Sequence, residues 1–258
     1  DEVLQRRDIV ALSFHVNYWD YLGWKDTLAT DETTDRQRTY ASFLGERSVY
    51  TPQLVIGGVR HEVGSRRAAV MATIARVAEN QDAMIAVPAT VDGDGNLHVR
   101  VGDGAPVQRD IVVWLVRFDK TQVVEIKRGE NRGRTLTYRN VVRDYRKLGM
   151  WYGKAMDLYL DLAKLREGGR DGVAILVQEN GAGRIVGALA IDLDTTAWRF
   201  EPSHRIRLSI SSADFPNSWP TPYKGTNRVY RDTTHPSRLE LPVVQAREAA
   251  QGKIPPDE

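Results

Sequence analysis

The stretch from residue 9 to residue 26, IVALSFHVNYWDYLGWKD, says most about the fold. Its first half is a short run of β-branched and large apolar residues, which predicts a strand over Asp8 to Val16. Its second half predicts a loop rich in aromatic rings, directly after the carboxyl end of that strand. Ligands bind at this position in open α/β sheets, so we expect a ligand site in the loop.

The candidate ligand-binding residues lie in this loop and at one position farther along the chain. They combine large rings with an imidazole and a carboxylate: His15, Tyr18, Trp19, Asp20, Trp24 and Pro52. A plainer interpretation stays open, in which the rings cap the core between two domains, because buried aromatic side chains chiefly pack.

Helices and a hairpin are expected in the rest of the first 82 residues. Thr30 is placed to cap a helix that runs to about Leu44, where Gly45 would end it. Residues 53–56 and 59–63 form a predicted hairpin around Gly57 and Gly58. A helix beginning at Ser65 carries apolar residues at spacings of four and three, so we expect it to cover the hairpin.

Beyond residue 82 the pattern changes mainly to strands, which predicts an α+β fold in which a β-rich, sandwich-like domain follows an α/β domain. A short helix is expected over Asp157 to Arg166, and Gly181 and Gly183 mark the turn of a second hairpin. The expected strands cover residues 84–91, 97–101, 111–118, 123–127, 173–178, 185–191 and 205–211.

Charge and composition exclude several classes of protein. The chain has 36 Lys and Arg against 34 Asp and Glu, a net charge of +2, which argues against nucleic acid as a partner of the chain as a whole. The longest apolar run that reads as a strand is far shorter than the roughly 20 residues of a membrane span. No cysteine is present, so this chain has no thiolate nucleophile, disulfide or cysteine metal site.

The strongest local charge lies between Lys127 and Lys147. This stretch contains eight Lys and Arg and two acids, Glu130 and Asp144, so its local net charge is +6. Such a cluster can bind an anion through charge-assisted hydrogen bonds. The alternative is a solvated strand-and-turn surface that pairs with acids elsewhere. The candidate anion-binding residues are Arg128, Arg132, Arg134 and Arg139.

Motifs for catalysis and for cofactors are missing from the sequence. There is no Gly-x-Ser-x-Gly pentapeptide, and no pair of the five histidines has the spacing that zinc hydrolases use. The stretch beginning at Gly129 has Arg134 where the second glycine of a P-loop would stand. We therefore expect no cofactor, no metal ion and no catalytic residue.

Several separate stretches, in the same order, resemble a bacterial family of exported thioredoxin-like proteins of unknown function. The resemblance covers residues 1 to about 192 and implies an exported protein, periplasmic or secreted, with Pro52 in the cis-proline loop. The matching stretches are residues 9–26, 37–40, 50–53 and 128–143.

This chain departs from that family in ways that bear on chemistry. Members begin with a strand followed by Cys-x-x-Cys, whereas the chain opens at Asp1, inside what should be the first helix. Asn17 stands where the family usually has aspartate. The missing strand is central in a thioredoxin sheet, so we expect residues 1–82 to be a partial domain that is rearranged or completed by a partner strand. Exposed strand edges of this kind also allow a homo-oligomer.

A second resemblance covers residues 193 to about 244. Residues 198–216, 226–228 and 235–242 are similar to the C-terminal jelly-roll domain of cocaine-esterase-like and Xaa-Pro dipeptidyl-peptidase-like serine hydrolases, with Ser203 in place of a glycine. The catalytic domain of that family lies upstream of the jelly roll and has no counterpart here. A natural fusion, a decayed gene and an artificial sequence would each explain such a junction.

These resemblances divide the chain into four parts and leave three functions open. The expected parts are a partial thioredoxin-like domain (1–82), a β-rich domain (83–192), a jelly-roll-like segment (193–245) and a flexible tail (246–258). The leading expectation is a noncatalytic binding or accessory protein for a small molecule or protein. The alternatives are a thiol-disulfide oxidoreductase that lacks its cysteines and a serine hydrolase suggested by the C-terminal segment.

Overall fold

The structure is a computed structural model that describes residues 3–6, 8–79, 84–92, 95–105, 109–129 and 131–193. The chain divides into two compact units after Asp194, and all described residues lie in the first. The expected strand 205–211, the expected segment 193–245 apart from Leu193, and the expected tail 246–258 lie outside the described residues.

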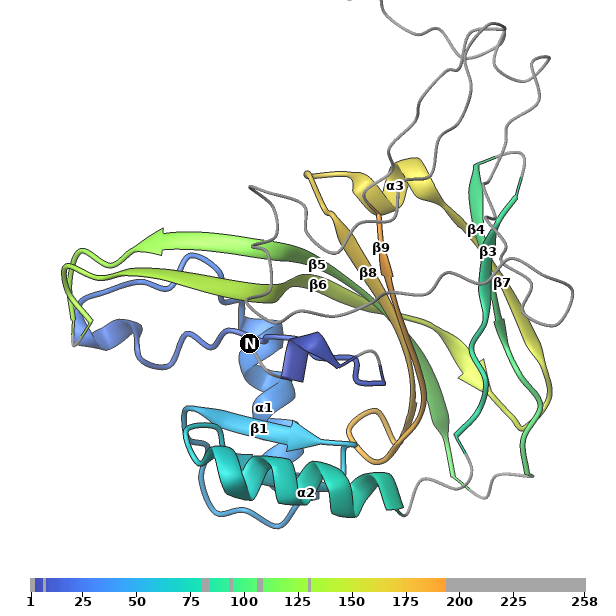
Figure 1. Cartoon of the computed structure of the whole chain (residues 1–258), viewed down its shortest axis with the longest axis horizontal. Helices are drawn as coiled ribbons and strands as arrows, with labels where there is room; N and C mark the ends of the chain where they lie inside the picture. The colour runs from blue at the N-terminus through green and yellow to red at the C-terminus, as the bar shows by residue number, and fades with distance from the viewer. Residues whose placement is uncertain are drawn as a thin grey trace, which may run out of the picture. The chain divides into compact units, whose positions relative to one another are not determined.

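The described part is a mixed α+β fold, as expected, and its strands form three antiparallel sheets (Figure 1). The first sheet is the β1-β2 hairpin, the second has the order β3-β4-β7, and the third has the order β6-β5-β8-β9. The strands are β1 Gln53–Ile56, β2 Arg60–Val63, β3 Ala89–Val91, β4 Asn96–Val101, β5 Ile111–Glu125, β6 Thr135–Trp151, β7 Met156–Asp161, β8 Gly172–Glu179 and β9 Ile185–Asp192. The helices are η1 Val3–Gln5, η2 Asp20–Leu22, α1 Asp31–Phe43, α2 Arg67–Glu79 and α3 Leu162–Arg166.

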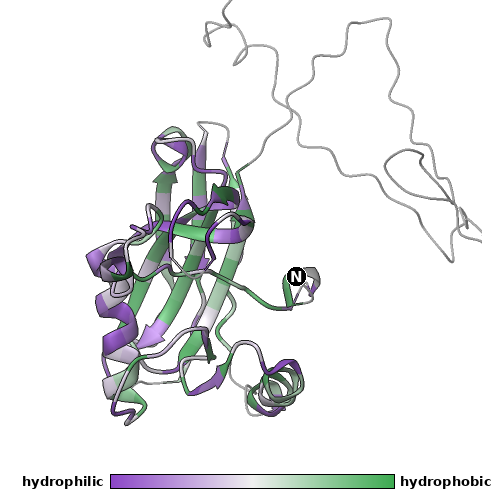
Figure 2. Cartoon of the chain, turned by 90° about the vertical axis from the view of Figure 1, so that its left-hand side faces the viewer, coloured by the Kyte–Doolittle hydropathy of each residue, from purple (hydrophilic) through white to green (hydrophobic). Residues whose placement is uncertain are grey.

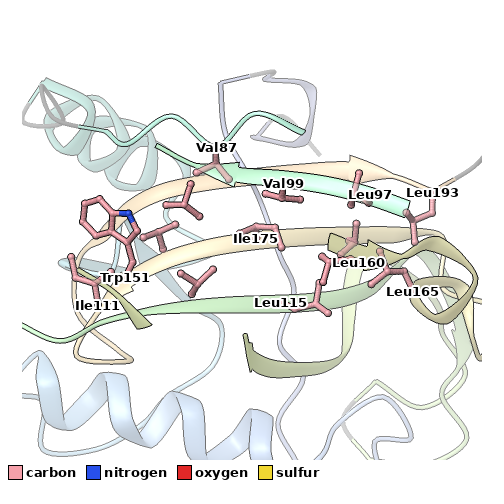
Figure 3. Close-up of a cluster of buried hydrophobic side chains, with 14 residues drawn as sticks. Val87, Leu97, Val99, Ile111, Leu115, Trp151, Leu160, Leu165, Ile175 and Leu193 are labelled. Atoms are coloured by element: carbon pink, nitrogen blue, oxygen red, sulfur yellow. The ribbon is translucent and has the colours of Figure 1, made fainter. Parts of the chain in front are cut away.

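The main core lies between the second and third sheets, which face each other as in a sandwich (Figure 3). Val99 from β4 and Val113 and Ile175 from the large sheet are completely buried there. Inward-facing apolar residues make the central strand β8 buried along almost its whole length. The strands of the large sheet accordingly appear as long green runs in Figure 2.

The predicted helices and hairpin of the first 82 residues are confirmed. Thr30 and Thr33 form a reciprocal capping box at the start of α1, and Gly45 follows its end with φ +74°. Helix α2 buries Val70, Ile74 and Val77 against Ile56 of β1, so it covers the hairpin as its spacing predicted.

The predicted strand over Asp8 to Val16 is wrong. This segment is extended, but only Ser13 forms a bridge, through backbone hydrogen bonds of 2.8 and 2.9 Å with Asn140 and Val142 of β6. Val10, Leu12 and Phe14 pack their side chains on the outer face of the large sheet instead. Residues 8–16 are thus held to the large sheet mainly by side-chain packing and not by strand pairing. Strand β1 therefore pairs with β2 alone among the described strands.

Three further expectations in the β-rich part need correction. Residues 157–161 belong to strand β7, because Leu158 and Leu160 face the core opposite β4, and the helix begins only after Asp161. Residues 111–125 form one strand, since the pairing with β6 continues through residues 119–122. Only residues 89–91 of the expected strand 84–91 are paired as a strand.

The long ribbon of β5 and β6 positions the aromatic loop. Its outer half reaches past β8 and β9 and lies over the N-terminal loop (Figure 1). The ring of Tyr138 on β6 meets the ring of His15 edge-on, with centroids 4.5 Å apart.

Candidate functional site

The centre of the candidate site is a row of three rings, defined by Tyr18, Trp19 and Tyr21. The ring centroids of Tyr18 and Trp19 lie 5.3 Å apart, and those of Trp19 and Tyr21 lie 6.3 Å apart. Trp19 is 44% exposed and Tyr21 is 76% exposed. Exposed neighbouring rings offer flat apolar area that a partner can cover.

The ring row is tied to the loop that contains Pro52. The indole Nε1 of Trp19 donates a hydrogen bond of 2.9 Å to the hydroxyl of Thr51. The Thr51-Pro52 peptide bond is cis, as the resemblance implied, and both residues are exposed. The structure therefore brings Tyr18, Trp19 and Pro52 into one surface.

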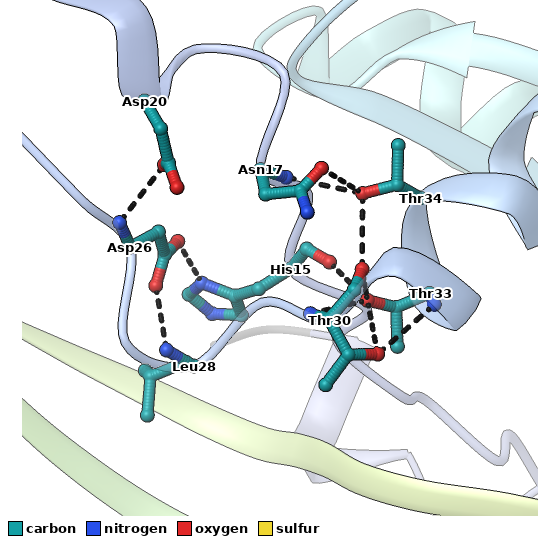
Figure 4. A network of polar contacts seen from close by, with 8 residues as sticks. All are labelled: His15, Asn17, Asp20, Asp26, Leu28, Thr30, Thr33 and Thr34. Atoms are coloured by element: carbon teal, nitrogen blue, oxygen red, sulfur yellow. Dashed lines mark hydrogen bonds and ion pairs between the residues drawn. The ribbon is translucent and has the colours of Figure 1, made fainter.

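His15 has internal partners instead of an exposed position (Figure 4). It is 9% exposed, and its Nδ1 lies 2.7 Å from Oδ2 of Asp26. Its carbonyl oxygen accepts a 2.7 Å hydrogen bond from Thr33. Burial works to raise the pKa of Asp26, but the hydrogen bond and charge of His15, together with backbone donors, lower it below the ordinary value.

Asp20 and Trp24 make contacts that hold the aromatic loop in its conformation. Oδ1 of Asp20 accepts a 3.0 Å hydrogen bond from the backbone N–H of Asp26, which closes the loop between them. Trp24 faces the tip of the β5-β6 ribbon, where a Cβ built on Gly129 would stand 3.6 Å from the Trp24 Cβ. These two candidates therefore hold the loop in place beneath the ribbon.

Asn17 joins the loop to the start of α1. Its amide donates to Asp31 at 2.6 Å and accepts from the hydroxyl of Thr34 at 2.8 Å. An aspartate at this position would bring a second carboxylate to Asp31, so the amide fits this arrangement.

Sequence reasoning missed a cluster of polar atoms next to the ring row. Gln37 donates at 2.8 Å both to the Tyr50 carbonyl and to Oε1 of Gln53. The Tyr18 hydroxyl, Oε1 of Gln37 and Nε2 of Gln53 are buried and have no hydrogen-bond partner among the described residues. Burial raises the pKa of Tyr18, partly offset by the nearby Gln37, Thr51 and Trp19 side chains. Both glutamines lie in stretches that carry the family resemblance, which was the available signal.

A second group of hydrogen-bonded polar side chains, which the sequence analysis also missed, lies next to the loop that contains Pro52. The hydroxyl of Tyr50 lies 2.7 Å from Nδ1 of His61, and Nε2 of His61 lies 3.0 Å from a carboxylate oxygen of Glu46. Burial raises the pKa of Tyr50, so this hydroxyl keeps its proton at neutral pH. These hydrogen bonds fix the segment that leads into Thr51 and Pro52.

The four candidate anion-binding arginines lie on the outer part of the β5-β6 ribbon. All four are exposed, and Arg139 donates to the hydroxyl of Thr121 across the ribbon. Farther along β6, Arg143 lies 3.6 Å from Asp119, which fits the expectation that part of the run pairs with acids. None of the four lines the cavity that β5, β6, β7 and α3 form within the described part of the chain.

The described residues hold no group of three or more His, Asp or Glu side chains that could bind a metal ion. No helix within the described ranges has the length and apolar character needed to cross a membrane.

Comparisons with known proteins identify the family of this chain. Residues 1–178 match a family described as a protein of unknown function, DUF1223. A crystal structure of a protein from Agrobacterium tumefaciens is similar, with a TM-score of 0.64 and 31% identity over 78% of this chain and 87% of that one. Two proteins provisionally named serine esterases, from Mycobacterium bovis and Mycobacterium tuberculosis, are 43% identical over 61 residues, 23% of this chain. The matched part is 10% of their length. This chain belongs to the DUF1223 family of unknown function.

Proposed function

We propose that this chain is a noncatalytic binding protein, thioredoxin-like in its first 82 residues, that holds an extended, proline-containing segment of a partner protein. The observation that carries the proposal is the row of Tyr18, Trp19 and Tyr21 beside Pro52, in which Trp19 and Tyr21 are exposed and Tyr18 is half-buried. Aromatic grooves bind proline-rich segments because a polyproline II helix is already extended and loses little entropy on binding.

The spacing of the rings suits such a segment. A polyproline II helix has three residues per turn and rises about 3.1 Å per residue, so residues on one face recur about 9 Å apart along its axis. The centroids of Trp19 and Tyr21 are 6.3 Å apart, and those of Tyr18 and Trp19 are 5.3 Å apart. The rings therefore lie close enough together to form one continuous apolar strip, against which one face of a bound segment can pack.

The buried polar cluster supplies a second argument. Gln37 offers a free acceptor and Gln53 a free donor, the complement of a peptide group. Burying such atoms without partners costs about 1–3 kcal/mol each, which an occupant with its own amide would recover.

The test is isothermal titration with a synthetic ten-residue polyproline peptide that carries an N-terminal arginine. We expect saturable binding that weakens by about tenfold in Trp19→Ala and in Tyr21→Ala, as for loss of a central aromatic anchor. Tyr152→Ala removes a ring that is 70% exposed outside the ring row, and should bind like the parent chain. Absence of saturation, or equal losses in all three variants, would reject the proposal.

The 61-residue match supports one other candidate, a serine hydrolase. An activated serine reacts with a fluorophosphonate probe, whereas an ordinary serine does not. We expect no labelling of this chain, and labelling that a substrate analogue blocks would favour the hydrolase. Thiol-disulfide exchange needs a thiolate, and the sequence contains no cysteine.

The resemblance stated above also supports export to the periplasm or medium. Fractionation of the source cells with an antibody tests this location, and recovery in the cytoplasm alone would contradict it.

A further inference from the structure

A cavity of about 410 Å³ lies at one edge of the sandwich, between the large sheet and the β7-α3 segment. It shares no lining residue with the ring row. Its floor is apolar, since Leu115, Leu160 and Leu165 are all buried. Small-molecule sites have volumes of about 300–1,000 Å³ and combine an apolar surface with a few polar groups.

One wall of the cavity is held together by hydrogen bonds of Arg117. Arg117 donates from Nε to Asp144 at 2.8 Å, and from Nη1 to the carbonyls of Lys164 and Glu167 at 3.0 and 3.3 Å. The hydrogen bond with Asp144 raises the pKa of Arg117, so this guanidinium stays charged. The ion pair therefore joins β5, β6 and α3 and is itself already satisfied.

Other charges at the cavity are free to bind a ligand. Arg146 and Lys164 are exposed, line the cavity and have no side-chain partner within the described part of the chain. The carboxylate of Asp161 accepts from the backbone N–H groups of Ala163 and Lys164, and within the described residues no ion pair joins it to Arg146 or Lys164. Asp161 and Glu167 both line the cavity, so the charges outside the Arg117–Asp144 pair are two acids and two cations.

An aromatic face completes the cavity. Tyr159 is 67% exposed and lines the cavity, while its ring stacks on His98 with centroids 4.6 Å apart and planes 7° apart. Asp157 lies 2.8 Å from Nε2 of His98 and so fixes that ring in turn. A ring held in this way is a prepared surface for a flat or apolar group.

We propose that this cavity binds a small organic anion, with its phosphate or carboxylate group between Arg146 and Lys164 and its flat or apolar body against Tyr159. Two cations provide charge-assisted hydrogen bonds for the anionic group, and the leucine floor excludes water from the body. The four exposed arginines of the ribbon line no part of this cavity.

The experiment is a calorimetric titration of the full chain with phenyl phosphate, and in parallel with inorganic phosphate. We expect phenyl phosphate to bind saturably, and the double variant Arg146→Gln/Lys164→Gln to weaken it by about tenfold. The double variant Arg47→Gln/Arg60→Gln makes the same change of charge at two exposed arginines that do not line the cavity, and should bind like the parent chain. Equal weakening of phenyl phosphate binding in both double variants would mean that only the overall surface charge matters, and would overturn the proposal.

A second pair of measurements tests the ring. Tyr159→Ala should lower the affinity for phenyl phosphate to that for inorganic phosphate and leave the latter unchanged. Trp19→Ala should not change phenyl phosphate binding, which separates this cavity from the peptide surface proposed above. Binding of inorganic phosphate as tight as that of phenyl phosphate to the parent chain would contradict a site for an organic anion.

Discussion

Asp26 illustrates how single residues hold the aromatic loop. Its carboxylate accepts a 2.9 Å hydrogen bond from the backbone N–H of Leu28 and lies 2.7 Å from the buried Nδ1 of His15. Its backbone N–H donates to the carboxylate of Asp20. The sequence suggested His15 and Asp20 as ligand-binding residues because they stand beside the rings. Their contacts indicate that they shape the loop, while the rings of Trp19 and Tyr21 face outward.

Replacing Asp26 by Asn should lower stability in a manner that depends on pH. The native pKa of Asp26 is lowered, so the carboxylate stabilises the fold above its unfolded pKa of about 3.9, and this contribution is lost as the pH falls through the native pKa. We expect Asp26→Asn to reduce the free energy of unfolding by about 1–3 kcal/mol at pH 7 and by less at pH 3.

Urea unfolding at several pH values measures this difference. Asp35→Asn is the control, because the Asp35 side chain is 67% exposed and pairs with Arg38 on the surface of α1. A loss in Asp26→Asn that stays constant from pH 7 to pH 3 would contradict the role of the carboxylate charge.

At the scale of elements, helix α1 docks on the large sheet through a buried cation. Arg36 is 6% exposed and donates at 2.9 Å to Oε1 of Gln178, which is fully buried. Its guanidinium carbon lies 5.1–5.6 Å from the centroids of four rings, which attract a cation through their π faces. These rings belong to Phe14, Tyr40, Trp114 and Tyr145.

Arg36→Met should destabilise the fold by about 1–3 kcal/mol, because it leaves the buried oxygen of Gln178 without its donor. The double variant Arg36→Met/Gln178→Leu should recover part of that loss, since both polar partners are then removed. Urea unfolding of the two variants and of Gln178→Leu completes the cycle. Additive losses would mean that the two side chains do not depend on each other.

At the scale of the whole described unit, the β1-β2 hairpin meets the sandwich at two turns. The N–H of Ile185 donates at 2.9 Å to the carbonyl of Gly57. A Cβ built on Gly58 would stand 1.9 Å from the carbonyl oxygen of Gly183, so only glycine allows the two backbones to approach this closely.

Gly58→Ala should therefore separate the hairpin from the β8-β9 turn. Gly45→Ala is a matched control, because φ is +74° there and +73° at Gly58, yet a Cβ on Gly45 meets nothing within 4 Å. We expect the free energy of unfolding to fall by roughly 1 kcal/mol in both variants, because alanine is strained in a left-handed backbone conformation. In Gly58→Ala it should fall by about 1–3 kcal/mol more, because the added Cβ collides with Gly183. Amide exchange at Ile185 should accelerate in Gly58→Ala alone, and equal stability of the two variants would contradict the contact.

The sequence by itself determined the elements whose signals are local. The Thr30 cap, the apolar spacing of α2 and the glycine turns of both hairpins depend on residues a few positions apart, and each prediction is confirmed. The rings of the aromatic loop were likewise visible as a cluster in the chain. The missing cysteines followed from composition alone.

Only the tertiary structure decided which of these residues face outward and which are held inside. Residues 9–16 have the composition of a strand, but side-chain packing on the large sheet left Ser13 as their one point of pairing. Residues 157–161 have helical spacing, yet pairing with β4 made them a strand. The cavity beside Arg146 and the unpaired amide atoms of Gln37 and Gln53 join residues far apart in sequence. Contacts of this range depend on the packing of the sheets, which local patterns do not encode.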